Sequence, residues 1–187
     1  MSGKFQMKIT PTTIPDVLVI EPKVFGDARG FFFESFNQKA FNEATGLNEI
    51  FVQDNLSSSS YNVLRGLHYQ VQCAQGKLVQ VIAGEVFDVA ADLRQSSPSF
   101  GQWVGTTLSA ANRLQHWIPP GFAHGFLVTS ASADVLYKTT AYYAPEHERT
   151  IRWNDTSVDI QWPLQGPPVL STKDRAAGPL KEADLFA

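Results

Sequence analysis

The 187-residue chain can bury a sizeable core, and we expect residues 1–187 to form one domain. Hydrophobic residues make up 43% and charged residues 18%, as in an ordinary globular protein, and the net charge of −3 argues against nucleic-acid binding. The single cysteine, Cys73, excludes an internal disulfide and favours a reducing compartment. The opening residues lack the apolar region of a signal peptide, and no later run reaches the length of a membrane span. We therefore expect a cytoplasmic protein that does not bind membranes.

Short β signals follow one another along the chain. They occupy residues 16–22, 64–70, 77–93, 103–109, 115–120, 125–130 and 133–145. Each is rich in β-branched and aromatic residues, and Gly, Pro, Asn and Ser separate them. Gly84 and Glu85 interrupt the pattern of 77–93 and predict a hairpin turn there. The serine run 57–60 is interpreted as a loop.

Two short helices are predicted among these strands. Asn37 suits the N-cap of a helix over residues 38–45, and Gly46 suits its C-terminal end. A second helix is predicted directly after Pro179. Many short strands with few helices predict a mainly all-β domain, which is a sandwich, a jelly roll or a barrel.

Residues 118–126, IPPGFAHGF, carry the P-x-G-x-x-H pattern that recurs in cupin jelly rolls. The first motif of metal-binding cupins supplies H-x-H and a glutamate, so that three histidines and one glutamate hold the metal. The corresponding stretch here is His68-Tyr69-Gln70, in which glutamine replaces the second histidine. A metal needs a full set of ligands, and His68 and His124 alone are too few, so we expect no metal. Simple packing of both histidines is the structural alternative.

Several separated blocks resemble one family when they are taken in chain order. They are FGDARGFFFES (25–35), FVQDN (51–55), VLRGLHYQ (63–70), residues 75–94, GFAHGF (121–126), residues 135–155 and LSTKD (170–174). Together they resemble the dTDP-4-dehydrorhamnose 3,5-epimerase family over almost the whole chain. The resemblance implies a cupin-like double-stranded β-helix, or jelly roll, and an isomerase that uses no cofactor. The implied reaction inverts C3 and C5 of dTDP-4-dehydro-6-deoxy-D-glucose and gives dTDP-4-dehydro-L-rhamnose.

Both of these carbons flank the C4 ketone, so the reaction needs a base, an acid on the opposite face and a positive group near the enolate oxygen. The resemblance implies that His68 is the base, steadied by Asp174. It further implies that Tyr137 is the acid and that Lys77 assists it and stabilises the enolate. Without the family, Asp174 reads equally well as a helix cap or turn residue, Tyr137 as a core aromatic and Lys77 as a solvated lysine.

The resemblance also implies a site for the nucleotide part of the dTDP-sugar. Its contacts would be Phe25, Arg29, Glu34, Gln53, Asn55, Arg65, His124, Tyr143, Glu148 and Lys173. Arg65 suits the diphosphate, Glu34 would accept from the thymine N3–H, and Phe25 would stack on the ring. Part of this wall would come from a partner subunit, which implies a homodimer. Taken alone, Asp27 and Arg29 favour a turn closed by a local ion pair.

Strand phase can be compared with these assignments independently of the family. Alternation along 133–145 places Tyr137, Thr139, Ala141 and Tyr143 on one face. The two tyrosines would then lie about 20 Å apart, which is the scale of an extended nucleotide sugar. One strand face would therefore carry an acid at the sugar and a ring that stacks on thymine.

The stretch RGLHYQ fits strand phase less well. Strict alternation places Arg65 and His68 on opposite faces of the strand. If both side chains face one pocket, a bulge or twist near Gly66 must change the phase.

Other functions remain open at the level of the sequence. A close variant epimerises one carbon only, or isomerises the ketone of a related nucleotide sugar. A metal-dependent cupin oxygenase predicts a bound transition metal and loss of activity with a chelator. A sugar-binding module without turnover predicts nucleotide-sugar affinity that His68→Ala leaves unchanged. Deuterium uptake at C3 and C5 separates the first of these from the double epimerase.

Overall fold

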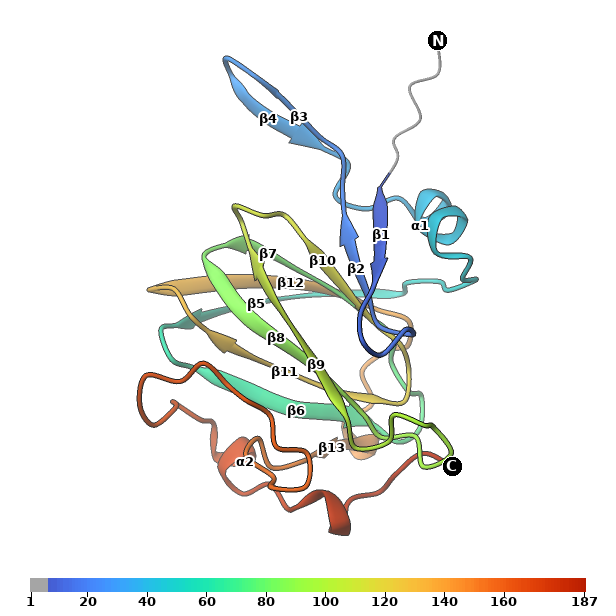
Figure 1. The fold of residues 1–187 in the computed structure, drawn as a ribbon, viewed down its shortest axis with the longest axis vertical. Coiled ribbons are helices and arrows are strands. Elements are labelled where there is room, and N and C mark those ends of the chain that lie inside the picture. The colour runs from blue at the N-terminus through green and yellow to red at the C-terminus, as the bar shows by residue number, and fades with distance from the viewer. Residues whose placement is uncertain (1–6) are drawn as a thin grey trace.

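The computed structural model describes residues 7–187, in which two antiparallel β-sheets pack face to face and a hairpin projects from one end (Figure 1). One sheet has the order β1 (Lys8–Pro11), β2 (Leu18–Glu21), β10 (Gln115–Ile118), β7 (Lys77–Ala83), β12 (Ser132–Thr139) and β5 (Gln53–Ser60). The other has the order β13 (Glu148–Thr150), β6 (Leu64–Gln70), β11 (Phe122–Val128), β8 (Glu85–Asp92) and β9 (Trp103–Ser109). The projecting hairpin is β3 (Val24–Asp27) with β4 (Gly30–Phe33). The predicted mainly β, jelly-roll class is confirmed.

The helices are short and lie at the edges of the sandwich. They are α1 (Gln38–Thr45), α2 (Thr172–Arg175) and two 3-10 turns, Pro145–His147 and Leu180–Glu182. The predicted caps of α1 are confirmed, since the Asn37 side chain accepts from the Ala40 N–H at 3.0 Å and Gly46 adopts a left-handed φ of 74°. The helix predicted after Pro179 is a single 3-10 turn. No helix within residues 7–187 combines the length and the apolar character needed to cross a bilayer.

Alternation along β8 contributes to two of the three apolar clusters in residues 7–187. On β8, Val86 and Ala90 pack between the two sheets, while Val89 and Ala91 pack on the opposite face. That opposite face is covered by the C-terminal segment, which contributes residues such as Ile160. The second sheet is therefore buried on both sides, and this explains why its strands read as nearly continuous apolar runs.

The hairpin predicted at Gly84 is wrong. β7 pairs with β10 and β12, whereas β8 pairs with β11 and β9, so the turn at Gly84 carries the chain from one sheet to the other. Gly84 has a φ of +75°, and a Cβ there would lie 1.9 Å from the Ser132 carbonyl oxygen. The turn signal was correct, but local sequence does not say which sheet the next strand joins.

The loop predicted at residues 57–60 is also wrong. These serines form the end of β5, which pairs with β12 along its whole length, with Ser57 opposite Val135 and Ser60 opposite Ser132. Serine has little intrinsic preference for strands, but pairing with a buried neighbour overrides that preference. The missed strand matters because its inward-facing residues, Gln53 and Asn55, line a cavity.

Candidate active site

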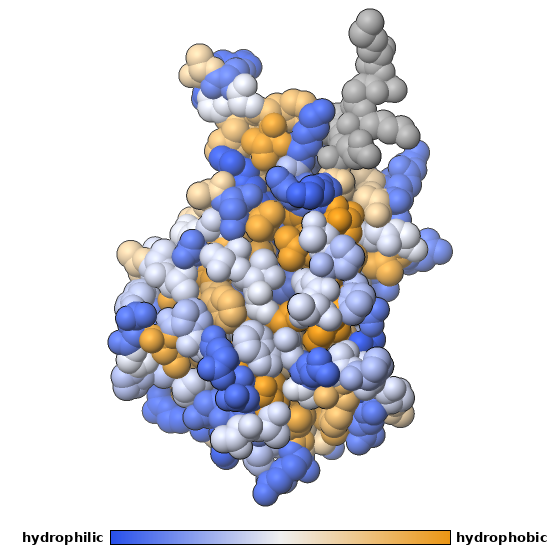
Figure 2. Space-filling view, in the orientation of Figure 1, coloured by the Kyte–Doolittle hydropathy of each residue, from blue (hydrophilic) through white to orange (hydrophobic). Residues whose placement is uncertain are grey.

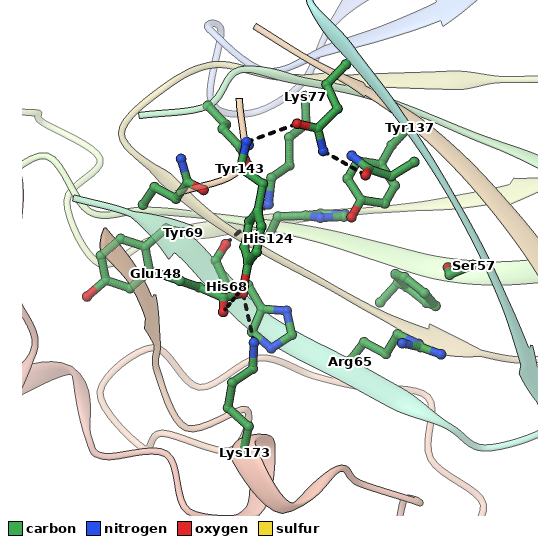
Figure 3. A pocket seen from close by; sticks show the side chains of 15 residues that line it. Ser57, Arg65, His68, Tyr69, Lys77, His124, Tyr137, Tyr143, Glu148 and Lys173 are labelled. Carbon is green, nitrogen blue, oxygen red and sulfur yellow. Dashed lines mark hydrogen bonds and ion pairs between the residues drawn. The ribbon is translucent and has the colours of Figure 1, made fainter. Parts of the chain in front are cut away.

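The space between the two sheets is apolar at one end and opens at the other into a polar cavity of about 350 Å³ (Figure 3). Strands β5, β6, β7, β11 and β12 supply most of its wall from inward-facing positions. The lining residues are Gln53, Asn55, Ser57, Arg65, His68, Tyr69, Gln70, Gln75, Lys77, His124, Phe126, Tyr137, Tyr143, Glu148 and Lys173. The volume suits a small-molecule ligand.

His68, in the middle of β6, is held by a carboxylate 106 residues away. Its Nε2 lies 2.5 Å from Asp174 Oδ1. Asp174 is buried in the first turn of α2, where Ser171 caps the helix and donates to Oδ2 at 2.7 Å. Burial alone would raise the pKa of Asp174, but the hydrogen bonds from His68 and Ser171 outweigh it and lower the pKa. An ionised Asp174 keeps the proton on Nε2, which leaves the Nδ1 lone pair of His68 to act as a base.

A bulge brings Arg65 and His68 to the same cavity, which meets the condition stated above for both side chains to face one pocket. His68 pairs with His124 and Arg65 pairs with Phe126, so three steps along β6 match two steps along β11. Gly66 sits at this irregularity with a φ of +126°, and a Cβ there would lie 2.6 Å from the Gly125 Cα. Only glycine fits such an approach, which explains the residue between the two cations.

Lys77 and Tyr137 face the cavity from adjacent strands. Lys77 opposes Thr139, two residues beyond Tyr137, and its Nζ donates to the His68 carbonyl oxygen at 3.4 Å. Burial lowers the pKa of Lys77 to about 8, against the opposing effect of Asp88. Burial raises the pKa of Tyr137, which keeps the phenol protonated. A protonated phenol and a readily deprotonated ammonium are therefore close to the candidate base.

A buried group that the sequence analysis missed lies behind these residues. Asp88 accepts from His124 Nε2 at 2.7 Å and from His116 Nδ1 at 2.8 Å. Burial would raise the pKa of Asp88, but the two imidazoles outweigh it and lower the pKa, whereas burial lowers the pKa of His124. An aspartate at an inward position of an otherwise apolar strand was the available signal. Asp88 fixes the orientation of His124 at the cavity wall.

Charged and aromatic residues form the rim of the cavity. Glu148 Oε1 accepts from Lys173 Nζ at 2.8 Å, and its Oε2 accepts from the Tyr143 hydroxyl at 3.0 Å. The prediction that Tyr137 and Tyr143 share one strand face is wrong, because β12 ends at Thr139. Tyr143 reaches the cavity from the connection that follows the strand (Figure 3).

Three predicted contacts lie outside this cavity in the single chain. Arg29, at the tip of the projecting hairpin, pairs with Asp27 at 2.6 Å and is 89% exposed. Phe25 is on the same hairpin, with the Lys23 ammonium 5.1 Å from its ring centre. Glu34 accepts from the Asn37 side chain at 3.1 Å. The local ion pair that the sequence allowed for Asp27 and Arg29 is therefore what this chain shows.

One ring nitrogen of each cavity histidine is engaged with a carboxylate, His68 Nε2 with Asp174 and His124 Nε2 with Asp88. Within residues 7–187, no three histidine, cysteine or acidic side chains are grouped so as to hold a metal ion. Gln70, in place of the second cupin histidine, donates its amide to main-chain carbonyls.

Proton transfer is the chemistry that this cavity offers. A candidate base, a buried ammonium and a protonated phenol line one small-molecule space, and each side chain comes from a paired strand. The fold and the cavity thus define an acid–base enzyme built on a jelly roll.

Comparison with known proteins shows to which family of enzymes this chain is similar. A family model described as dTDP-4-dehydrorhamnose 3,5-epimerase matches residues 11–182. The dTDP-4-dehydrorhamnose 3,5-epimerase of Pseudomonas aeruginosa is 62% identical over 180 residues, covering 96% of this chain and 99% of that protein. A dTDP-6-deoxy-D-glucose-3,5-epimerase from Legionella pneumophila, solved with dTDP-4-keto-L-rhamnose, superposes with a TM-score of 0.95 at 55% identity over 97% of this chain and 98% of that one.

A more distant solved structure is a 3′-monoepimerase from Streptomyces bikiniensis in complex with dTDP-quinovose. It has 30% identity and a TM-score of 0.86, and the match covers 91% of this chain and 87% of that one. The chain belongs to the dTDP-4-dehydrorhamnose 3,5-epimerase family and is an isomerase.

Proposed function

We propose that the cavity inverts C3 and C5 of dTDP-4-dehydro-6-deoxy-D-glucose and so forms dTDP-4-dehydro-L-rhamnose. The observation that carries this proposal is that His68, paired with Asp174, shares one cavity with Lys77 and Tyr137. The identity of 62% to a 3,5-epimerase over nearly the whole chain supports the choice of substrate.

At each carbon the reaction breaks one C–H bond and forms another. His68 Nδ1 takes the proton next to the C4 ketone, and the electron pair moves to the ketone oxygen as an enolate. Lys77 donates a hydrogen bond to that oxygen, which stabilises its charge. Tyr137 then gives its hydroxyl proton to the carbon from the opposite face. Exchange with water returns the imidazolium and the phenolate to their starting states.

Incubation of the substrate in deuterated water tests the reaction. We expect one deuterium at C3 and one at C5 of the inverted product, read by NMR. Deuterium at one carbon only would show that the enzyme epimerises a single centre. Single epimerisation is the second candidate function, because the chain is 30% identical to a 3′-monoepimerase. The absence of any exchange would favour the binding-module alternative, and activity that a chelator removes would favour a metal-dependent reaction.

Arg65 is proposed to contact the diphosphate. Its Nε donates to the Ser59 hydroxyl at 3.0 Å and its Nη2 to the Ser58 carbonyl at 3.4 Å, so the guanidinium is anchored on β5 at the cavity wall. We expect Arg65→Ala to raise KM about 10- to 100-fold and to leave kcat nearly unchanged, since a phosphate contact is present before and during the chemistry. Steady-state kinetics measures this, and a loss of kcat at constant KM would contradict it.

Lys77 predicts an alkaline limit to activity. Because burial lowers its pKa to about 8, the ammonium is present below that pH and is lost as the pH rises through it. We expect kcat to fall over the same interval. Lys77→Met should lower kcat about 10²- to 10³-fold and remove this alkaline limb from the pH profile. A limb near the same pH that persists in the variant would show that another group titrates there.

We further propose a homodimer in which each β3–β4 hairpin reaches the cavity of its partner. The hairpin projects from the body of the subunit (Figure 1), and apolar surface lies where it emerges (Figure 2). Phe31 is 59% and Phe32 is 63% exposed, which favours burial against another chain. Phe25, Arg29 and the nearby Glu34 do not line the cavity of their own subunit. This arrangement would bring them to the nucleotide in the cavity of the partner subunit.

Co-expression of two inactive variants tests the exchange of hairpins. One variant is His68→Asn, and the other carries Arg29→Ala and Glu34→Ala. In a hybrid dimer, the site with intact His68 receives the intact hairpin, and the other site has neither. Random pairing makes about half of the dimers hybrids, each with one active site of two, so about a quarter of wild-type activity should return. No recovery in a dimer verified by sedimentation would mean that the hairpin serves its own subunit.

The proposed substrate and the single cysteine bear on where in the cell the protein acts. A nucleotide-sugar substrate and the lone thiol Cys73 suit the cytoplasm, where we propose that residues 1–187 act as one catalytic domain without a cofactor. Fractionation of cells that express the chain tests its location.

A further inference from the structure

The segment 140–144, between β12 and the 3-10 helix Pro145–His147, carries Tyr143 at the rim of the cavity. It lies outside the sheets, so its main-chain polar groups lack ladder partners. At its start, the Thr140 N–H donates to the Gly76 carbonyl at 3.0 Å and the Thr140 hydroxyl accepts from the Gly76 N–H at 2.8 Å. From residue 141 onward, glutamine side chains provide partners.

Gln70 makes the central contacts. Its Nε2 donates to the Tyr142 carbonyl at 3.3 Å and to the Cys73 carbonyl at 2.9 Å, and its Oε1 accepts from the Ala144 N–H at 2.9 Å. The side chain is only 3% exposed. One amide thus joins segment 140–144 to the connection between β6 and β7.

Two more glutamines hold the same segment on either side. Gln75 Nε2 donates to the Ala141 carbonyl at 3.0 Å. Gln53 Oε1 accepts from the Tyr143 N–H at 2.9 Å, while its Nε2 donates to the Asn55 side chain at 2.9 Å. Each residue from 141 to 144 therefore has one main-chain group bonded to a glutamine.

The chemistry of the segment calls for an amide. It presents two carbonyl oxygens and then two N–H groups, and of the polar side chains of this length only glutamine both donates and accepts without charge. A glutamate at position 70 would repel the Tyr142 carbonyl, and an apolar side chain would leave buried polar groups unpaired.

We propose that Gln53, Gln70 and Gln75, the glutamine clamp, hold segment 140–144 so that Tyr143 is in place for the nucleotide before it binds. Gln70 is then a positioning residue for substrate affinity, although it contacts main chain. This inference rests on the proposed function and on the expectation from the sequence that Tyr143 stacks on thymine, for which its place in the cavity wall is the structural support.

The clamp acts on binding and not on the chemical step. His68, Lys77 and Tyr137 lie on strands that the clamp does not hold in place. Losing the clamp lowers the fraction of molecules in which Tyr143 is correctly placed, and the apparent affinity falls by that fraction. We expect Gln70→Leu to weaken dTDP binding about tenfold and to raise KM with little change in kcat.

A double-mutant cycle on the full chain tests the clamp. dTDP affinity is measured by titration calorimetry for the wild type, Gln70→Leu, Tyr143→Ala and the double variant. The matched control is Gln38→Leu, because Gln38 donates to the Glu49 carbonyl at 2.6 Å and accepts from the Phe51 N–H at 3.2 Å, outside the cavity. The control should retain wild-type affinity. If Gln70→Leu does not fold, Gln75→Leu removes one bond of the clamp and takes its place.

The inference is supported if Gln70→Leu weakens dTDP binding in the wild-type background and not in the Tyr143→Ala background. Equal weakening in both backgrounds overturns it, because Gln70 would then act elsewhere. An effect of Tyr143→Ala without an effect of Gln70→Leu overturns the clamp and leaves the role of the ring intact. If Tyr143→Ala binds dTDP normally, both the stacking role of Tyr143 and the positioning role of the glutamine clamp are wrong. The epimerase reaction is tested separately by deuterium uptake.

Discussion

Replacing His68 by asparagine is expected to abolish deuterium exchange at both C3 and C5 and to lower kcat by about 10³-fold or more. The same Nδ1 lone pair is proposed to take both protons, so no second base remains for either carbon. Asparagine is shorter than histidine and does not reach the position of Nε2, so the buried Asp174 carboxylate loses this one partner. NMR of the substrate in deuterated water reads both positions in one experiment.

Loss of activity alone would not separate a missing base from a damaged fold. The Asp174 carboxylate also accepts from Ser171, so the α2 turn keeps a contact when the imidazole is gone. We expect the variant to unfold at nearly the wild-type temperature and to bind dTDP normally. Exchange that persists at one carbon in His68→Asn would show that a different group removes that proton.

Replacing Tyr137 by phenylalanine is expected to separate exchange from inversion. The ring, which packs beside the apolar core, remains, but the hydroxyl that would deliver a proton to the opposite face is gone. Net inversion should fall by about 10²- to 10⁴-fold. Proton removal by His68 should continue, so deuterium should still enter the substrate with its configuration retained.

The informative measurement is the ratio of deuterium uptake to product formation in Tyr137→Phe. We expect that ratio to rise well above the wild-type value. A variant that forms product at the wild-type rate would remove Tyr137 from the mechanism. A variant that loses uptake and inversion equally would assign the phenol to proton removal. Since burial raises the pKa of Tyr137, the wild-type phenol should stay protonated through neutral pH.

These two results bear on why one site can invert two centres. The proposed base, His68, is held by a buried carboxylate, and the proposed acid, Tyr137, lies in a strand that is paired on both sides. Two opposed and immobile proton-transfer groups invert whichever acidic carbon lies between them. Rotation of the sugar, not movement of the protein, would then present C3 and C5 in turn.

Much of the local structure was predictable from residue patterns. The strand signals at 64–70 and 103–109 match β6 and β9 at both ends, and the Asn37 and Gly46 caps of α1 are as predicted. Caps, turns and alternation are decided by residues a few positions apart, so the sequence carries them directly. The candidate catalytic residues were available only through resemblance to a family, because no local spacing connects His68 with Asp174.

The tertiary structure alone decided how these pieces meet. It assigned β7 and β8 to different sheets, placed the serine run in β5 with Ser57 at the cavity, and placed Asp88 between two histidines. It also supplied the bulge at Gly66 that brings Arg65 and His68 together. The reason is physical: strand pairing and the burial of a charge depend on partners that are distant in the chain, and a local pattern contains no information about which distant partner will satisfy them.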